Sequence, residues 1–410
     1  MFRARDRGRN IFRVEQDADA NGVPSFAARL DRALAVSEAI KDAAEESDDA
    51  AGLRWLSTVD RSSHVGSLHH TVPRFMLQQW ASRNQVRIYS RVDKRFSVRN
   101  TKDIGVRDFY TLVNTDGHLE STLESLLREV ERSGSAVISR LLSPFYKEAS
   151  LRLDDFVALA DLAAFQVVRT TRRRRELEVH ADWYGKTMAA GRVPDEELRK
   201  LSIVPDQNGV LSSAMNSARE IMPMIAMRPL AIVWITGAQF LLGDEPLLAN
   251  VGSSEAGHHP DCFLTEADMQ KRFAAERRKK KGDRRRVTRV IHFQSKTGGI
   301  GTALELAMPI SPHAALWWGP LIGPEWTPDS VEVERLSVDE SARFAALANR
   351  GMCSQSLEWV VSTLDDAAFQ EMDMLDSEPL LSVCDGDNAA ALAVNTVPER
   401  LRPYRLTRPK

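Results

Sequence analysis

The residues best suited to chemistry in this sequence are two adjacent histidines followed closely by a proline. His69 and His70 precede Thr71-Val72-Pro73. A proline disfavours a regular helix through the residues ahead of it, so the backbone here is expected to be extended or turned. Imidazole titrates near neutral pH and could act as a general base or bind a metal. The alternative is that one ring bonds to the backbone and fixes the turn, and no ligand spacing supports a metal.

Three carboxylates could supply acid and base groups. Glu124 and Glu131 are seven residues apart on an expected helix, so they point the same way. They are either paired carboxylates facing a site or part of a charged helix face, which is the commoner case. Asp244 follows an apolar strand in Gly243-Asp244-Glu245-Pro246. Such an Asp can be functional, or it can simply accept hydrogen bonds from backbone amides.

Gln166 and Arg169 are polar residues on a helix that is otherwise apolar on most sides. Burying an unpaired guanidinium is very costly, so Arg169 must face a carboxylate or an anionic ligand. Internal partners could come from Asp108, Glu131 or Asp244. Four arginines, 172–175, follow on the same helix, and a second basic run covers 277–286. Either run could contact phosphates, although the second lacks aromatic residues and favours a solvated loop.

Composition and missing motifs narrow the function classes. The 410 residues carry a net charge of −2, so no overall field attracts nucleic acid or anionic lipid. The sequence has no Walker loop, dinucleotide fingerprint, nucleophile elbow or zinc-binding His-Glu-x-x-His. The three cysteines are far apart and odd in number, which indicates reduced thiols. No apolar stretch approaches the ~20 residues of a membrane span, and no secretory signal is visible, so a cytoplasmic protein is expected.

The elements that must position these residues indicate an α+β fold. We expect a mainly helical body with a small antiparallel hairpin and, in the C-terminal half, an antiparallel sheet. Helices are expected at 119–142, from Asp154 or Asp155 to about His180, at 196–201, 212–227 and 338–362, the last with Phe344, Leu347 and Val360 in the core. Strands are expected at 85–89, 95–98, 231–235, 239–242, 287–293, 302–308 and 314–318.

Three regions are expected along the chain. Residues 1–60 form an N-terminal arm with an appended helix starting at Phe26, which docks on the body or on a protein partner. Residues 61–370 form the main α+β domain. Residues 371–410 form a C-terminal tail rich in proline and arginine.

Several short motifs together resemble one family. The stretch 70–77 resembles the "H-aromatic-V-P-x-F-x-L" opening of a bacterial family catalogued as domain of unknown function 4238. Further motifs follow in the family's order, namely Asp108-Phe109-Tyr110, Glu124 with Glu131, Gln166 with Arg169-Thr170, Gly243-Asp244-Glu245-Pro246, Pro309-Ile310-Ser311-Pro312 and Asn349. The resemblance covers about residues 66–365. Thr71 replaces an aromatic residue and Glu245 replaces an Asn. The resemblance implies a fold unit and a set of positions, without a reaction.

The polar residues lead to two hypotheses. The first is an intracellular hydrolase of phosphodiesters, such as a nuclease, in which a divalent metal could take part. Its catalytic residues would be His70, Asp108, Glu131 and Asp244, and its phosphate-binding residues Gln166, Arg169, Arg172 and Arg173. The second is a non-catalytic module that binds nucleic acid or protein, in which the same cluster is a structural ion-pair network.

Overall fold

The computed structural model describes most of the chain between residues 69 and 392. The described residues are 69–107, 112–113, 119–120, 122–143, 151–189, 194, 196, 207–250, 271, 274–275, 277–279, 292–294, 300–301, 303–321, 331–372, 374, 376–377, 380–384 and 390–392. The expected N-terminal helix, Asp108 and most of the basic run 277–286 lie outside them, as does most of the helix expected at 196–201. The chain divides into two compact units: unit 1 holds 1–174, 206–250 and 303–377, and unit 2 holds the rest.

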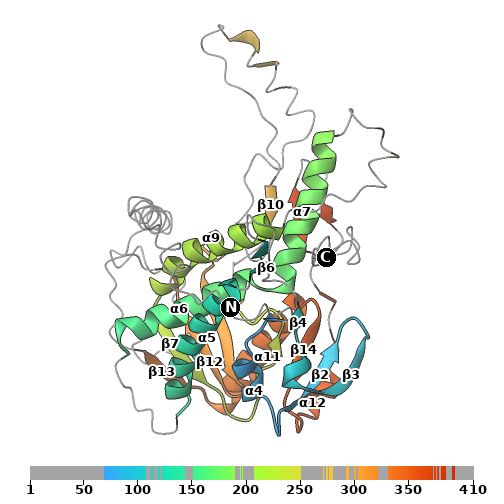
Figure 1. Cartoon of the computed structure of the whole chain (residues 1–410). Helices are drawn as coiled ribbons and strands as arrows, with labels where there is room; N and C mark the ends of the chain where they lie inside the picture. Colours follow the sequence, from blue (N-terminus) through green and yellow to red (C-terminus); the bar gives the residue numbers. More distant parts are fainter. Residues whose placement is uncertain are drawn as a thin grey trace. The chain divides into compact units, whose positions relative to one another are not determined.

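A five-stranded sheet forms one part of the core of unit 1 (Figure 1). Its strand order is β13-β7-β12-β11-β9, made of Glu332–Arg335, Leu230–Trp234, Ala314–Trp318, Glu305–Ser311 and Leu248–Asn250. All neighbours pair antiparallel except β13 with β7. Every residue of β12 is buried, which explains the unbroken apolar run in its sequence. The antiparallel sheet expected in the C-terminal half is confirmed.

The predicted hairpin at 85–98 is confirmed and belongs to a second sheet. Strands β2 (Gln85–Ser90) and β3 (Arg95–Asn100) pair antiparallel, and Lys94 in the turn has a positive φ. The sheet order is β3-β2-β14-β8, in which β14 is Trp359–Ser362 and β8 is Leu242–Gly243. The hairpin is therefore continued by two strands from the distant C-terminal half.

The late helix is shorter than the sequence prediction. Helix α11 runs from Val338 to Gln355 after a capping box made by Ser337 and Glu340, and the segment expected as its last turn is the strand β14. The run of aromatic and β-branched residues at 359–361 favours a strand over a helix. Phe344 and Val360 are buried as expected, whereas Leu347 is 52% exposed and was wrongly placed in the core.

Three long helices cover the rest of unit 1. They are α5 (Thr122–Leu141), α6 (Leu153–Val168) and α9 (Gln207–Ala226), and α6 packs against both of the others. Gly134 of α5 lies so close to Leu162 of α6 that a Cβ there would be 2.8 Å from the leucine side chain. The helices expected at 119–142 and 212–227 are confirmed with shifted ends, and residues 119–120 belong to the short strand β6.

The helix expected from Asp154 to His180 is two helices, with a break at Arg169 and Thr170. Helix α7 begins at Thr171 and ends at Ala189. Thr170 Oγ1 accepts a hydrogen bond from Arg173 N at 3.2 Å, as an N-cap residue does, so a helix start is encoded here. Asp155 was expected as a cap. It lies in the first turn of α6 and accepts a hydrogen bond from Arg152 N at 3.0 Å.

The remaining elements are short. In unit 1 they are β1 (His69–His70), α4 (Arg74–Gln79), η1 (Thr101–Asp103), β4 (Val106–Arg107), β5 (Leu112–Val113), β6 (Leu119–Glu120) and α12 (Ala368–Glu371). In unit 2, β10 (His292–Gln294), β15 (Leu381–Cys384) and β16 (Ala390–Leu392) form a sheet in the order β10-β15-β16. The α+β class is confirmed. Within the described residues, no helix is both long enough and apolar enough to cross a membrane.

Candidate functional site

His70 lies at the end of a two-residue strand that is held from both sides. Strand β1 pairs antiparallel with β4, and Thr71 N then donates to Gly105 O at 2.8 Å. Gly105 has φ +62°, and a Cβ there would be 2.9 Å from Thr71 Oγ1 and 3.2 Å from the ring of Trp359. Both the backbone angle and the lack of space require glycine at this position. The extended backbone expected for the two histidines is confirmed.

The contacts of His70 fix the ring and its tautomer. Nδ1 lies 3.1 Å from Ile104 O. Because a carbonyl oxygen can only accept, Nδ1 must carry the proton of this hydrogen bond, and Nε2 of the neutral ring keeps its lone pair. Nε2 has no hydrogen-bond partner in the described part of the chain, and His70 as a whole residue is half-buried.

The surroundings of His70 favour the neutral ring. Burial lowers the pKa of His70 from its ordinary value, and the positive charges of Arg169 and Arg74 act in the same direction. The Ile104 carbonyl and the Glu131 carboxylate oppose this shift without cancelling it. At neutral pH His70 is therefore an uncharged imidazole with a carboxylate near it.

Arg169, almost fully buried, is bound by three internal acceptors. Nη1 donates to Glu131 Oε1, Nη2 to the backbone oxygen of His70 and Nε to that of Thr71, each at 2.7 Å. Its side chain is 3% exposed, and that of Glu131 is 28% exposed. Glu131 is one of the internal partners that the sequence suggested. The guanidinium thus ties α5 and the end of α6 to the backbone that carries His70.

The side-chain amide of Gln166 is buried in α6 and receives no hydrogen bond from its neighbours among the described residues. The residue is 1% exposed, and neither its Oε1 nor its Nε2 has a hydrogen-bond partner among the described residues. It precedes Arg169 by three positions, so the two lie on the same side of the helix. A buried side-chain amide without partners costs free energy, and such groups need an explanation beyond folding.

Arg74 is an exposed cation beside His70 that sequence reasoning overlooked. It is the first residue of α4, directly after Pro73, and its charge acts on His70. No hydrogen bond or ion pair involves its side chain in the part of the chain that the structure describes. The sequence offered a signal, because Arg74 lies inside the motif that also contains His70. We refer to His70, Arg74, Glu131 and Arg169 as the histidine cluster.

Asp244 is completely buried and holds a turn of the backbone. Its carboxylate accepts hydrogen bonds from Glu358 N at 2.7 Å and from Leu357 N at 3.0 Å. Burial, together with the nearby Glu358 carboxylate, raises the pKa of Asp244 to about 7. The two backbone amides and the charge of Arg172 limit this rise. Asp244 therefore fixes the connection between α11 and β14, as an Asp that accepts hydrogen bonds from backbone amides does.

Buried polar groups surround Asp244. Arg172 Nε donates to Gln355 O at 2.8 Å, and Arg172 N donates to Glu245 Oε1 at 3.1 Å. Gln355 Nε2 in turn donates to Leu247 O at 3.0 Å. We refer to Asp244, Glu245, Arg172, Gln355 and Glu358 as the aspartate cluster.

The arginine run is more enclosed than its sequence suggests. Arg172, Arg174 and Arg175 are buried and Arg173 is half-buried, although the run was expected where the helix leaves the core. That expectation was wrong, because carboxylates and carbonyls in the protein accept these guanidinium groups. The hydrogen bond from Arg172 Nε to Gln355 O is one such case, and the ion pair of Arg175 with Glu178 is another.

The two clusters are joined through β4. Arg107, which pairs with His69 in the register of β1 and β4, donates from Nη2 to Glu358 Oε2 at 2.7 Å. The charged groups that act on His70 are Glu131, Arg169 and Arg74, whereas those that act on Asp244 are Glu358 and Arg172. The structure thus brings His70, Glu131 and Arg169 together, and it places Asp244 with Arg172 in a separate group.

Three further sequence candidates have different outcomes. Glu124 lies on α5, but its side chain is outside the described residues, as is all of Asp108. Asn349 has a structural role: Oδ1 accepts from Leu241 N at 2.8 Å and Nδ2 donates to Gln239 O at 2.9 Å. It fastens α11 to the segment before β8.

Among the described residues, no group of three or more His, Cys, Asp or Glu side chains is placed to hold a metal.

Comparison with known proteins supports the order of these motifs. A family model described as "Protein of unknown function (DUF4238)" matches residues 68–366. The matched span includes His70, Glu131, Gln166, Arg169 and Asp244, and it confirms the resemblance seen over about 66–365. No curated protein and no solved structure matches the chain. The chain therefore belongs to the DUF4238 family.

Proposed function

We propose that this protein is an intracellular hydrolase of phosphodiesters, with nucleic acid as its substrate class, and that its reaction is centred on His70. The observation that carries the proposal is the state of this ring. The bond from Nδ1 to Ile104 O leaves the Nε2 lone pair without a partner among the described residues, and burial keeps the ring neutral at neutral pH. A neutral imidazole with an available lone pair is the general base that such hydrolysis needs.

The reaction assigns a task to each member of the histidine cluster. Nε2 of His70 removes a proton from a water molecule, and the resulting hydroxide attacks phosphorus while the P–O bond to the leaving alkoxide breaks. The Glu131 carboxylate stabilises the imidazolium that forms, since its charge acts to raise the pKa of His70. The exposed guanidinium of Arg74 binds a non-bridging phosphate oxygen.

Arg169 acts as a positioning residue in this proposal. Its guanidinium donates to Glu131 and to the backbone oxygens of His70 and Thr71, so it holds both the base and the carboxylate in place. Arg172 and Asp244 support the neighbouring connection in the same way. Their roles therefore differ from the sequence-based assignment of Arg169 and Arg172 to phosphate and of Asp244 to acid–base chemistry. Gln166, whose buried amide has no partner among the residues that the structure describes, is available to bind a water molecule or a polar group of the substrate.

The proposal is tested by hydrolysis of bis(4-nitrophenyl) phosphate and of labelled single-stranded DNA and RNA, with and without Mg²⁺ or Mn²⁺. We expect His70→Asn to lower kcat/KM by about 10²–10⁴-fold, the range for losing a general base. Since His70 must be neutral to act, activity should fall as pH decreases through its folded pKa, which lies below 6.5. Arg74→Ala should raise KM more than it lowers kcat.

A matched control is available in the same unit. His313 is an exposed histidine whose Nδ1 also lies 3.1 Å from a backbone oxygen, that of Ala238. His313→Asn should leave the hydrolysis rate unchanged. Equal losses in both variants, or a wild type inactive on all these phosphodiesters under every metal condition, would contradict the proposal.

A non-catalytic binding module is the second candidate, and the saturation of Arg169 favours it. A guanidinium with three internal acceptors needs no ligand, so the histidine cluster could serve only to join α5 and α6 to β1. In that case labelled DNA, RNA or a protein partner would bind without turnover, and His70→Asn would leave the affinity unchanged.

A further inference from the structure

Three sulfur atoms that belong to neither the histidine cluster nor the aspartate cluster lie close together at the end of helix α11. Cys353 Sγ lies 3.9 Å from Met372 Sδ and 3.8 Å from Met374 Sδ. Cys353 comes from the last turn of α11, and the two methionines come from the segment that follows α12. From these contacts we infer that Cys353, Met372 and Met374 form a binding site for a soft monovalent metal ion of the copper(I) class.

The spacing of the sulfurs suits such an ion. Three sulfurs bound at about 2.3 Å in a trigonal plane lie about 4.0 Å from one another. The separations of Cys353 Sγ from the two methionine sulfurs are both within 0.2 Å of this value. Thiolate and thioether ligands together select copper(I) over harder divalent ions.

The charge balance of the site points to a monovalent ion. The sulfurs border a buried apolar cluster made of Leu241, Met352, Cys353, Val360 and Phe369, with Tyr89 and Phe96 packed against it. Cys353 loses its thiol proton on binding, so a monovalent cation and one thiolate form a neutral group. A divalent cation would leave a net positive charge beside the apolar cluster and near Arg91, whose guanidinium donates to Cys353 O, and such a charge is costly.

The two methionines are less enclosed than the cysteine. Cys353 is 2% exposed, whereas Met372 and Met374 are half-buried. A cysteine binds metal as the thiolate, so binding at Cys353 releases the thiol proton.

The test is anaerobic titration of the full chain with copper(I) held by a competing chelator, and with silver(I) as a redox-inert probe. Cys262→Ser and Cys384→Ser are introduced first so that Cys353 is the remaining thiol. We expect one equivalent bound, with about one proton released per metal ion. Met372→Leu and Met374→Leu conserve volume and should each weaken the affinity at least tenfold.

Met352→Leu is the matched control, because Met352 belongs to the same apolar cluster but its sulfur faces Gly243. It should bind as the parent does. Absence of binding would overturn the inference, and so would an affinity that the Met372 and Met374 substitutions leave unchanged, since that would reflect an ordinary thiol. The two leucine substitutions keep this test valid even if Cys353→Ser fails to fold.

Discussion

Arg169 and Arg74 both lie near His70, but Arg169 is buried whereas Arg74 is exposed. Arg169→Ala leaves Glu131 and two backbone oxygens without their donor, so we expect a loss of about 3–5 kcal/mol in unfolding free energy. Arg74→Ala removes an exposed side chain that has no partner in the described part of the chain, and it should change stability by less than about 0.5 kcal/mol. Thermal and urea unfolding of both variants measures the difference.

The same pair distinguishes a structural role from a ligand role. Inorganic phosphate or a nucleotide should raise the melting temperature of the wild type and not that of Arg74→Ala. If the shift survives in Arg74→Ala, the anion binds elsewhere. If no anion or divalent metal shifts the wild type while Arg169→Ala is severely destabilised, the histidine cluster is a structural ion-pair network.

Gln166 offers a residue-scale test of function against stability. Its buried amide has no partner among the described residues, so the folded protein gains no hydrogen bond from it. Gln166→Leu has a similar volume and should leave the unfolding free energy unchanged or raise it by about 1 kcal/mol. Phosphodiester hydrolysis should fall in the same variant if the amide binds water or substrate. A destabilised Gln166→Leu protein would show instead that the amide is satisfied in solution.

Asp244 predicts a dependence of stability on pH. The pKa of this carboxyl is 3.8 in the unfolded chain and is raised to about 7 in the folded protein. Between these two pH values the folded protein therefore keeps a proton that the unfolded chain has lost. Its contribution to the unfolding free energy is therefore present at low pH and declines as pH rises from about 4 to about 7. Asp244→Asn should remove that decline. The lowered pKa of His70 acts in the opposite direction in both proteins, so the difference between their urea-unfolding profiles isolates Asp244.

At the scale of elements, the break between α6 and α7 depends on two adjacent threonines in different roles. Thr170 Oγ1 accepts from Arg173 N, while Thr171 Oγ1 is buried without a partner among the described residues. Thr170→Val should therefore cost about 1 kcal/mol, the value of an N-cap hydrogen bond. Thr171→Val removes an unsatisfied hydroxyl and should be neutral or stabilising. Equal effects in chemical unfolding would show that Thr170 does not cap α7.

Sequence patterns predicted a helix or strand well where one of its faces is apolar. They predicted it poorly where a tertiary contact determines where the element ends or whether it is a helix or a strand. The hairpin at 85–98, the long helix α5 and strand β12 follow directly from periodicity and burial. The helix break at Arg169 and the strand at Trp359 were missed. Arg169 is bound by backbone oxygens from β1 and the residue after it, and Trp359–Ser362 pairs with β2, which lies far away in the sequence. Neither partner is visible in the local pattern.

The candidate site could be predicted only in part, because some of its contacts join residues that are far apart in the sequence. The pairing of Arg169 with Glu131 could be inferred from the cost of burying a lone guanidinium. The separation of Asp244 from His70 could not, because it depends on the register of β14 beside β8. Arg74 was overlooked because an exposed arginine at a helix start has no distinctive pattern. Its importance comes only from its position next to His70.

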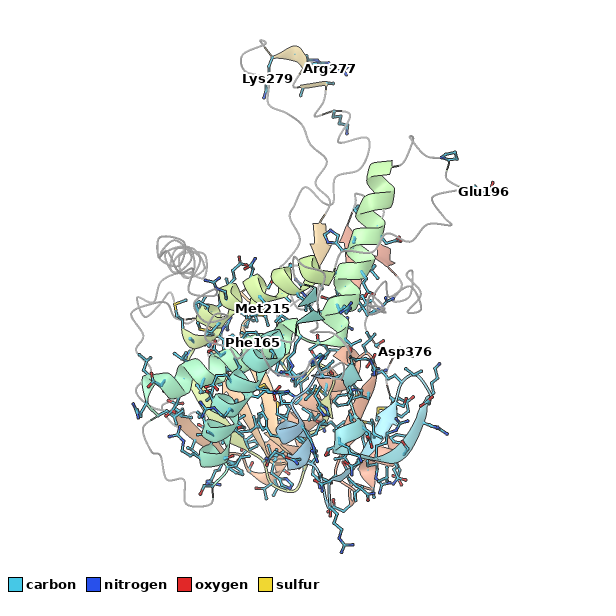
Figure 2. All side chains as sticks on the ribbon, viewed as in Figure 1. Phe165, Glu196, Met215, Arg277, Lys279 and Asp376 are labelled. Atoms are coloured by element: carbon cyan, nitrogen blue, oxygen red, sulfur yellow. The ribbon has the colours of Figure 1, made fainter. Side chains whose placement is uncertain are left out.

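At the scale of the whole molecule, the five-stranded and four-stranded sheets of unit 1 both combine strands from the two halves of the chain. In the five-stranded sheet, β7 and β9 precede residue 251, and β11, β12 and β13 follow residue 302. In the other sheet, β14 lies between β2 and β8. The segment that joins the halves, 251–302, belongs to unit 2 and contains the basic run 277–286. Its residues Arg277, Arg278 and Lys279 are exposed, and the first and last of these are labelled in Figure 2.

This topology predicts the behaviour of the chain after a single cut. Brief trypsin treatment should cleave first within 277–286, because exposed basic side chains there give the protease ready access. The two fragments should then stay together on gel filtration and melt cooperatively, since the pairing of β12 with β7 and of β14 with both β2 and β8 crosses the cut. They should separate only in denaturant. A chain in which the basic residues of the run are replaced by glutamine is the control and should resist the early cut. Separation of the two fragments under native conditions would contradict the strand order. In that case each fragment would have to form its sheets without the strands that the other fragment contributes.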